Sequence, residues 1–185
     1  RFFMFLIIRL IRIKHWIKNL FVFIPLLVSG NIFDEVLFYK SIIIFFVFSF
    51  TSSAVYIFND LMDIEFDKLH PKKKNRPLAN GTITISLANS VAAFLLASSL
   101  LLLYLINFDG LFPILLYLII NILYSLYLKN LPLFDIFSIS LGFVLRVFAG
   151  LAVTSLSSSF WLISLTFTLS LLLATGKRRH ELAFN

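Results

Sequence analysis

The chain contains 185 residues, of which 60% are hydrophobic and only 14% are charged, and 23 of them are Phe. This composition and a mean hydropathy of +0.98 exclude a water-soluble globule and indicate a membrane protein. The apolar runs do not alternate with polar residues as barrel strands would, so an all-α fold is predicted. The absence of Cys excludes disulfides and thiolate chemistry, and the net charge of +7 is assigned to membrane orientation rather than to nucleic-acid binding.

Six apolar segments predict membrane-spanning helices, in the ranges 17–29, 41–61, 85–106, 111–128, 135–154 and 160–175. The first is short, and it spans only if the amphipathic stretch 2–16 leads it in from the interface. With a cytoplasmic N-terminus, every Lys and Arg except Lys40 and Arg146 falls on the cytoplasmic side, as the positive-inside rule expects. The predicted fold is therefore a polytopic transmembrane helical bundle in the cytoplasmic (inner) membrane.

A cluster of acids, NDLMDIEFD at 59–67, follows the second apolar run directly. On a helix, Asp60, Asp63 and Asp67 are spaced i, i+3, i+7 and share one face, where three carboxylates repel unless a cation lies between them. Oxygen ligands of this kind suit Mg²⁺, whose coordination a substrate's phosphates usually complete. We therefore predict that these three acids are catalytic metal ligands and that the substrate carries a diphosphate.

The next segment, KLHPKKKNRPLANG at 68–81, is basic and contains prolines that exclude a continuous helix. Lys72, Lys74 and Arg76 are expected to bind phosphate oxygens, since Arg offers a bidentate fork. For the loop alone, the alternative is an orientation signal that contacts anionic lipid. The neighbouring acids favour substrate binding, so residues 60–84 are the predicted cytoplasmic catalytic loop.

Two ionisable residues, Asp135 and Arg146, fall in a predicted span, where such a residue costs about 2.5–3.5 kcal/mol on insertion scales and suggests function. They are about three helical turns apart and share a face without touching. Arg146 either binds a phosphate or is a structural residue that pairs with carbonyls of another helix, as nearby small residues such as Gly142 and Gly150 would allow. Asp135 either belongs to the catalytic site, which we favour, or caps its helix.

The acids at 59–67, followed by RPLANG at 76–81, resemble the first signature of the UbiA-type polyprenyltransferase superfamily. Its members are helical membrane enzymes with two Asp-rich cytoplasmic loops that bind Mg²⁺ and a diphosphate. The stretches HPKKKNRP (70–77), RIKHWIKN (12–19) and GKRRHEL (176–182) resemble its decaprenyl-phosphate phosphoribosyltransferase branch.

The resemblance implies further substrate-binding residues, namely Lys18, Asn19, Asn59, Lys177 and Arg178. For Lys18 and Asn19 the alternative is snorkelling at the interface, and for the cations at 177–179 it is a positive-inside signal. The second Asp-rich motif of the superfamily is reduced to Asp135 here. Since the family has about nine helices, residues 1–185 are expected to form a single membrane domain truncated at its C-terminus.

The branch implies Mg²⁺-dependent transfer of a 5-phosphoribosyl group from phosphoribosyl diphosphate to a polyprenyl (decaprenyl) phosphate. The alternative is an aromatic polyprenyltransferase, in which a prenyl diphosphate is the donor and an aromatic ring attacks. The basic run at 72–74 favours the first, because a multiply phosphorylated donor needs more cations. A non-catalytic membrane transporter or scaffold is disfavoured, because transport sites lie near the membrane midplane and this cluster lies at its edge.

Overall fold

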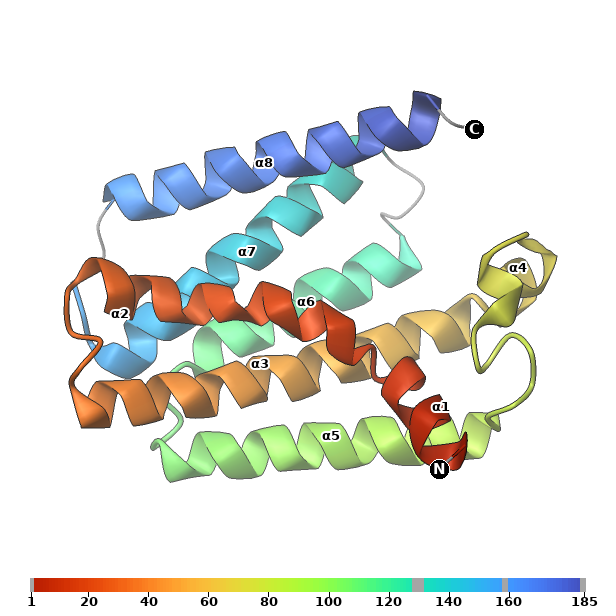
Figure 1. The fold of residues 1–185 in the computed structure, drawn as a ribbon, viewed down its shortest axis with the longest axis horizontal. Helices are drawn as coiled ribbons and strands as arrows, with labels where there is room; N and C mark the ends of the chain where they lie inside the picture. Colours follow the sequence, from red (N-terminus) through yellow and green to blue (C-terminus); the bar gives the residue numbers. More distant parts are fainter. Residues whose placement is uncertain (1, 128–131, 158–159, 184–185) are drawn as a thin grey trace.

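The computed structural model describes residues 2–127, 132–157 and 160–183. These residues form helices and no strand, which confirms the predicted all-α class (Figure 1). The elements are α1 (Phe2–Leu10), the 3₁₀ helix η1 (Ile13–Phe23), α2 (Ile24–Val28), α3 (Glu35–Met62), α4 (Ile64–Leu69), the short 3₁₀ helix η2 (Lys73–Asn75), α5 (Ile85–Leu105), α6 (Leu111–Leu126), α7 (Pro132–Thr154) and α8 (Phe160–Ala183).

Three helices, Glu35–Met62, Ile85–Leu105 and Ile136–Thr154, are long and apolar enough to cross a membrane. The helices Leu111–Leu126 and Phe160–Gly176 are also apolar but shorter. Helix α3 has 28 residues and so measures about 42 Å, more than the roughly 30 Å of hydrocarbon in a bilayer. Its acidic residues near both ends can therefore reach the headgroup region while its centre stays in the apolar layer.

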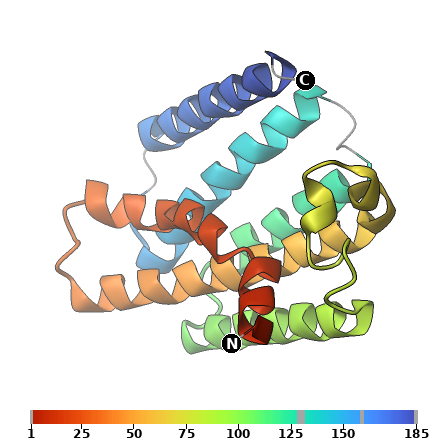
Figure 2. The same cartoon turned by 45° about the vertical axis from the view of Figure 1, so that its right-hand side comes forward.

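The long helices alternate in direction, so the connections fall at two ends of the bundle (Figures 1 and 2). The α5–α6 turn lies at one end, whereas the chain's N-terminus, α4 and the C-terminal end of α8 lie at the other. We call the latter the α4 end. The basic stretches at 9–18 and 68–76 belong to elements that meet there, as the predicted sidedness requires.

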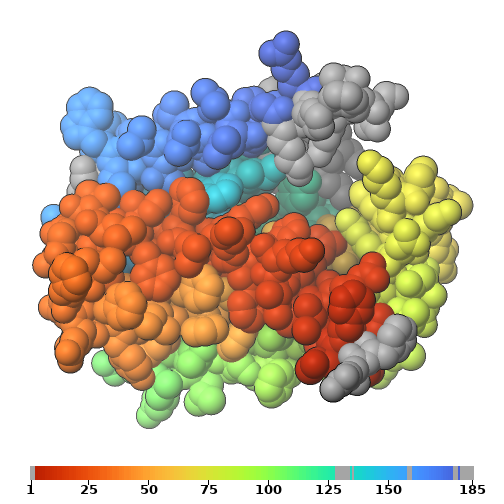
Figure 3. Space-filling view, viewed as in Figure 1, coloured from red at the N-terminus to blue at the C-terminus, as the bar shows by residue number. Residues whose placement is uncertain are grey.

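The first predicted span, 17–29, is divided between η1 and α2, and it is preceded by α1. These three elements together lie across the middle of one face of the bundle, between α8 and α5 (Figure 3). A 3₁₀ helix has three residues per turn, so Trp16, Asn19 and Val22 lie in one row. This row faces α3, where Trp16 donates to Ser53 Oγ and Asn19 to Ser49 Oγ, both at 3.0 Å.

The bundle core is built around α3, which packs against α5, α6 and α7. Phe48 is fully buried at its centre and meets the ring of Tyr117 on α6 edge-on at 5.1 Å. The hydroxyls of Thr51 and Ser99 lie 2.9 Å apart between α3 and α5. On α7, a Cβ at Gly150 would collide with the carbonyl oxygen of Val22, so glycine permits the close approach of η1. The core thus fixes η1 between α3 and α7.

Candidate functional site

The acid cluster lies where the chain changes direction at the α4 end. Helix α3 ends at Met62 and α4 begins at Ile64, and Asp63 between them has φ −104° and ψ 8°. The three acids therefore do not lie on one continuous helix, which was the condition for the predicted shared face. The break is local, because Asp63 N still donates to the Asn59 carbonyl at 3.1 Å and Asp67 N to the Asp63 carbonyl at 2.8 Å.

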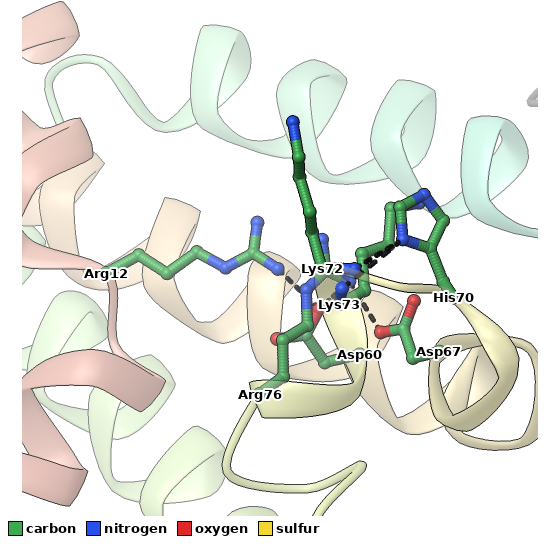
Figure 4. A network of polar contacts seen from close by, with 7 residues as sticks. All are labelled: Arg12, Asp60, Asp67, His70, Lys72, Lys73 and Arg76. Carbon is green, nitrogen blue, oxygen red and sulfur yellow. Dashed lines mark hydrogen bonds and ion pairs between the residues drawn. The ribbon is translucent and has the colours of Figure 1, made fainter. Parts of the chain in front are cut away.

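Asp60 and Asp67 converge on the guanidinium of Arg76 (Figure 4). Arg76 Nη1 lies 3.0 Å from Asp60 Oδ1 and 2.6 Å from Asp67 Oδ2. Arg12 Nη2 donates to the same Asp60 Oδ1. The two carboxylates are only 5% and 3% exposed, so they need paired cations. The positive charge that the sequence required between the acids is thus supplied by two arginines.

Arg12 was not predicted as a site residue, because the sequence places it in an amphipathic interfacial stretch. It lies 48 positions before Asp60, and the packing of η1 on α3 brings the two together. Its guanidinium also lies over the Tyr56 ring, with the Cζ atom 4.8 Å from the ring centroid. The signal that could have identified it is its place at the start of RIKHWIKN, one of the stretches on which the family resemblance rests.

The contacts of the acids indicate whether these carboxylates could hold a divalent metal ion. Among the residues that the structure describes, no group of three or more His, Cys, Asp or Glu side chains is close enough to hold one. Two of the three predicted ligands, Asp60 and Asp67, do converge on a single cationic nitrogen. Asp63 is half-buried at the helix break and has contacts of its own. Convergent carboxylate oxygens fit Mg²⁺, which commonly takes one or two carboxylates and completes its shell with water and phosphate.

The structure confirms that the basic loop after α4 is not a continuous helix, since it contains only the short η2 turn. His70 Nδ1 accepts hydrogen bonds from the backbone N–H groups of Lys72 and Lys73 at 3.1 and 3.3 Å (Figure 4). The side chains of Lys72 and Lys74 are exposed. The loop therefore presents cations to solvent beside the paired acids, whereas Arg76 from the same loop points into them.

A second arginine centre lies inside the bundle. Arg146 is 4% exposed, and it donates from Nε to Asn19 Oδ1 at 2.8 Å and from Nη1 to the Gly142 carbonyl at 2.6 Å. Its Cζ atom lies 5.2 to 5.5 Å from three ring centroids, those of Phe48, Tyr117 and Phe143. All partners of Arg146 are internal, as in the structural alternative, but the carbonyl that it binds belongs to its own helix α7 and not to another helix. Fully buried Asn19 is likewise held inside the bundle, because it bonds to Arg146 and to the hydroxyls of Ser49 and Ser52. Substrate binding by either residue stays a prediction.

The remaining predicted residues are placed less completely. Asn59 is half-buried beside Asp60 near the end of α3, and Lys18 is exposed on η1. The backbone of Asp135 belongs to the first turns of α7, and that of Lys177 and Arg178 to the last turns of α8. The side chains of these last three fall outside the described residues, so their predicted roles remain predictions.

Known proteins resemble the chain in both sequence and structure. It is 35% identical over 180 residues to decaprenyl-phosphate phosphoribosyltransferase of Corynebacterium glutamicum, across 95% of this chain and 54% of that protein. The chain thus spans about half the length of this curated relative. A solved structure described as a digeranylgeranylglyceryl phosphate synthase in membranes superimposes with a TM-score of 0.76 at 26% identity, covering 95% of this chain and 61% of that one.

A second solved structure, a UbiA homologue from Archaeoglobus fulgidus bound to DMAPP and Mg²⁺, has a TM-score of 0.75. At 24% identity, over 89% of this chain and 59% of that one, this likeness shows the shared fold. Residues 20–181 match the UbiA prenyltransferase family, which confirms the resemblance found in the sequence and, with the apolar helices, makes this an integral membrane protein. By this match, which covers most of its length, the chain belongs to the UbiA prenyltransferase family.

Proposed function

We propose that the protein transfers a 5-phosphoribosyl group from phosphoribosyl diphosphate to a polyprenyl phosphate in a Mg²⁺-dependent reaction. The observation that carries this proposal is the convergence of two buried carboxylates, Asp60 and Asp67, on one cation beside an exposed basic loop. The 35% identity to a protein named for this reaction supports the choice of substrates. The concentration of basic residues at the α4 end supports a cytoplasmic location of this site.

Different residues of the chain bind different parts of the donor, phosphoribosyl diphosphate. Asp60 and Asp67, with Asp63 close in sequence, would hold Mg²⁺, which neutralises a leaving diphosphate when bound. Lys72, Lys74 and Arg76 bind the remaining phosphate oxygens. The acceptor's phosphate oxygen forms a bond to the anomeric carbon as the bond from that carbon to the diphosphate breaks, and the diphosphate leaves with the electron pair. The acceptor is already anionic, so no strong general base is required.

A second candidate is prenyl transfer from a prenyl diphosphate, to an aromatic or another acceptor. The fold shared with a digeranylgeranylglyceryl phosphate synthase favours it, because the same acids would serve a prenyl diphosphate equally well. The exposed Lys72 and Lys74 favour the first candidate, since phosphoribosyl diphosphate carries an additional phosphate.

The test uses the protein expressed from its complete gene and purified in detergent. It is incubated with Mg²⁺, radiolabelled phosphoribosyl diphosphate and a polyprenyl phosphate, and label in the lipid phase is counted. Asp67→Asn should abolish transfer. Asp109→Asn is the matched control, because Asp109 pairs with Lys40 at 3.2 Å in the turn away from the α4 end. Failure of the native protein to label the lipid, with turnover of a prenyl diphosphate instead, would favour the second candidate.

A further inference from the structure

Arg12, Asp60, Asp67 and Arg76 form a group of four charges whose sum is zero, which we call the charge quartet. We propose that the charge quartet excludes a free divalent cation and admits it together with a diphosphate, which takes over the two guanidiniums from the carboxylates. This proposal rests on the proposed function in that it assumes a diphosphate-bearing substrate. It assigns to Arg12, at the start of η1, a role in binding that substrate.

Geometry makes the arginines and a metal ion compete for the same atoms. Asp60 Oδ1 accepts hydrogen bonds from both guanidiniums, and Arg76 Nη1 bridges the two carboxylates. A metal ion bound between these oxygens has to displace Arg76 from the bridge. It also has to share or replace the contact that Arg12 makes with Asp60 Oδ1. A metal ion between these two oxygens and the Arg76 bridge therefore exclude each other.

The charges of the quartet determine whether a metal ion can bind there alone or only with a diphosphate. A divalent cation adds two positive charges to the neutral quartet, and Asp63, the third acid of the cluster, can offset only one of them. The remaining charge lies beside carboxylates that are at most 5% exposed, which is costly where the effective dielectric constant is low. A diphosphate carries several negative charges and offers oxygens to which both guanidiniums can donate. The metal ion and the diphosphate together keep the site close to neutral, whereas the metal ion alone does not.

Arg12 can exchange partners without movement of its backbone. Its side chain is 19% exposed, so it is accessible from the solvent side. The backbone on either side is anchored to α3, because Ser53 Oγ donates to the Ile11 carbonyl at 2.7 Å and accepts from Trp16 Nε1 at 3.0 Å. Arg12 itself has a positive φ of 53° at the joint between α1 and η1. A fixed backbone with a partly exposed guanidinium suits a side chain that changes partner.

The experiment measures Mn²⁺ binding by electron paramagnetic resonance, with the detergent-solubilised protein expressed from its complete gene. Titrations are made without and with inorganic pyrophosphate, and a titration without protein corrects for the Mn²⁺–pyrophosphate complex in solution. Arg12→Gln removes the competing charge and Arg12→Lys retains it. Arg9→Gln is the matched control, because Arg9 belongs to the same N-terminal segment but donates to the Asn75 carbonyl at 3.0 Å instead.

The native protein should bind Mn²⁺ at least about tenfold more tightly with pyrophosphate than without it. Arg12→Gln should bind Mn²⁺ alone about fivefold more tightly than the native protein and should lose much of the gain from pyrophosphate. Arg12→Lys and Arg9→Gln should behave like the native protein. This opposite change in the two affinities is not expected from a residue that only supports the fold.

Two results would overturn the proposal. One is a native protein that binds Mn²⁺ equally well with and without pyrophosphate, which does not depend on any variant being folded. The other is an Arg12→Gln protein that unfolds like the native one yet binds Mn²⁺ alone no more tightly. Neither measurement includes a transfer step. The binding experiments can therefore contradict the role of the charge quartet while the transfer assay still supports phosphoribosyl transfer, and the reverse.

Discussion

The molecule holds arginine in two different settings, and the comparison distinguishes the proposed ligand site from a set of purely internal contacts. At the α4 end, Arg12 and Arg76 are 19% and 26% exposed and are bound to carboxylates. Inside the bundle, Arg146 is 4% exposed and is bound to an amide, a carbonyl and three aromatic rings. Arginines at the solvent edge can exchange carboxylates for phosphates, whereas Arg146 would have to leave aromatic rings and its hydrogen bonds.

Among the variants that test this comparison, the largest loss of transfer is expected from Asp60→Asn, which removes the charge that both guanidiniums share. Breaking a buried ion pair from one side costs about 3–5 kcal/mol, because the partner charge is left uncompensated. Partial exposure of Arg12 and Arg76 should reduce this cost to about 1–2 kcal/mol in thermal unfolding. Phosphoribosyl transfer should fall at least about 100-fold. Full activity in this variant would remove the distinction between the two arginine settings.

Gly150→Ala should disturb both settings at once, because η1 carries Asn19 as well as the segment after Arg12. The new Cβ would collide with the Val22 carbonyl, so η1 and α7 must separate. We expect a loss of about 1–3 kcal/mol in the free energy of unfolding, with weaker binding of Mn²⁺ in the presence of pyrophosphate. Gly176→Ala is the control, because a Cβ at that position would have no neighbouring atom within 4 Å. Equal stability of the two variants would contradict the tight η1–α7 contact.

Arg146→Met tests whether the inner arginine is structural. Methionine can fill the space among the rings, but the Asn19 Oδ1 atom loses its donor, so we expect a loss of about 1–3 kcal/mol in the free energy of unfolding. The affinity for Mn²⁺ in the presence of pyrophosphate should change less than twofold, which corresponds to at most about 0.4 kcal/mol in binding free energy. Loss of that affinity with unchanged thermal stability would instead assign Arg146 to the substrate.

The smallest effect is expected from Lys40→Gln, near the start of α3 and away from the α4 end. Lys40 pairs with Asp109 at 3.2 Å, and both side chains are about a third exposed. Such a pair contributes about 0–1 kcal/mol, and neither metal binding nor transfer should change. Differential scanning fluorimetry beside the transfer assay checks this. A large loss of transfer would show that the acidic site is not confined to the α4 end.

Site residues that are close together in the sequence were predicted, whereas a residue far away in the sequence and a break in a helix were not. Asp60, Asp67 and Arg76 lie within one short stretch whose composition marks it, and the structure brings these three together. Arg12 was missed because its partner is 48 positions away, and the helix break at Asp63 was missed because i, i+3, i+7 spacing describes only a continuous helix. Spacing along the chain carries no information about such distant contacts.

The sequence by itself determined the class of this protein: a helical membrane bundle with basic residues at one end and an acid cluster at the edge of a span. These properties follow from composition and local pattern, because the cost of placing charge in hydrocarbon acts on each segment separately. Only the tertiary structure decided which cations the acids hold. That outcome depends on how closely η1 approaches α3 and α7, which glycine at 150 and polar contacts such as those of Trp16 and Asn19 determine together.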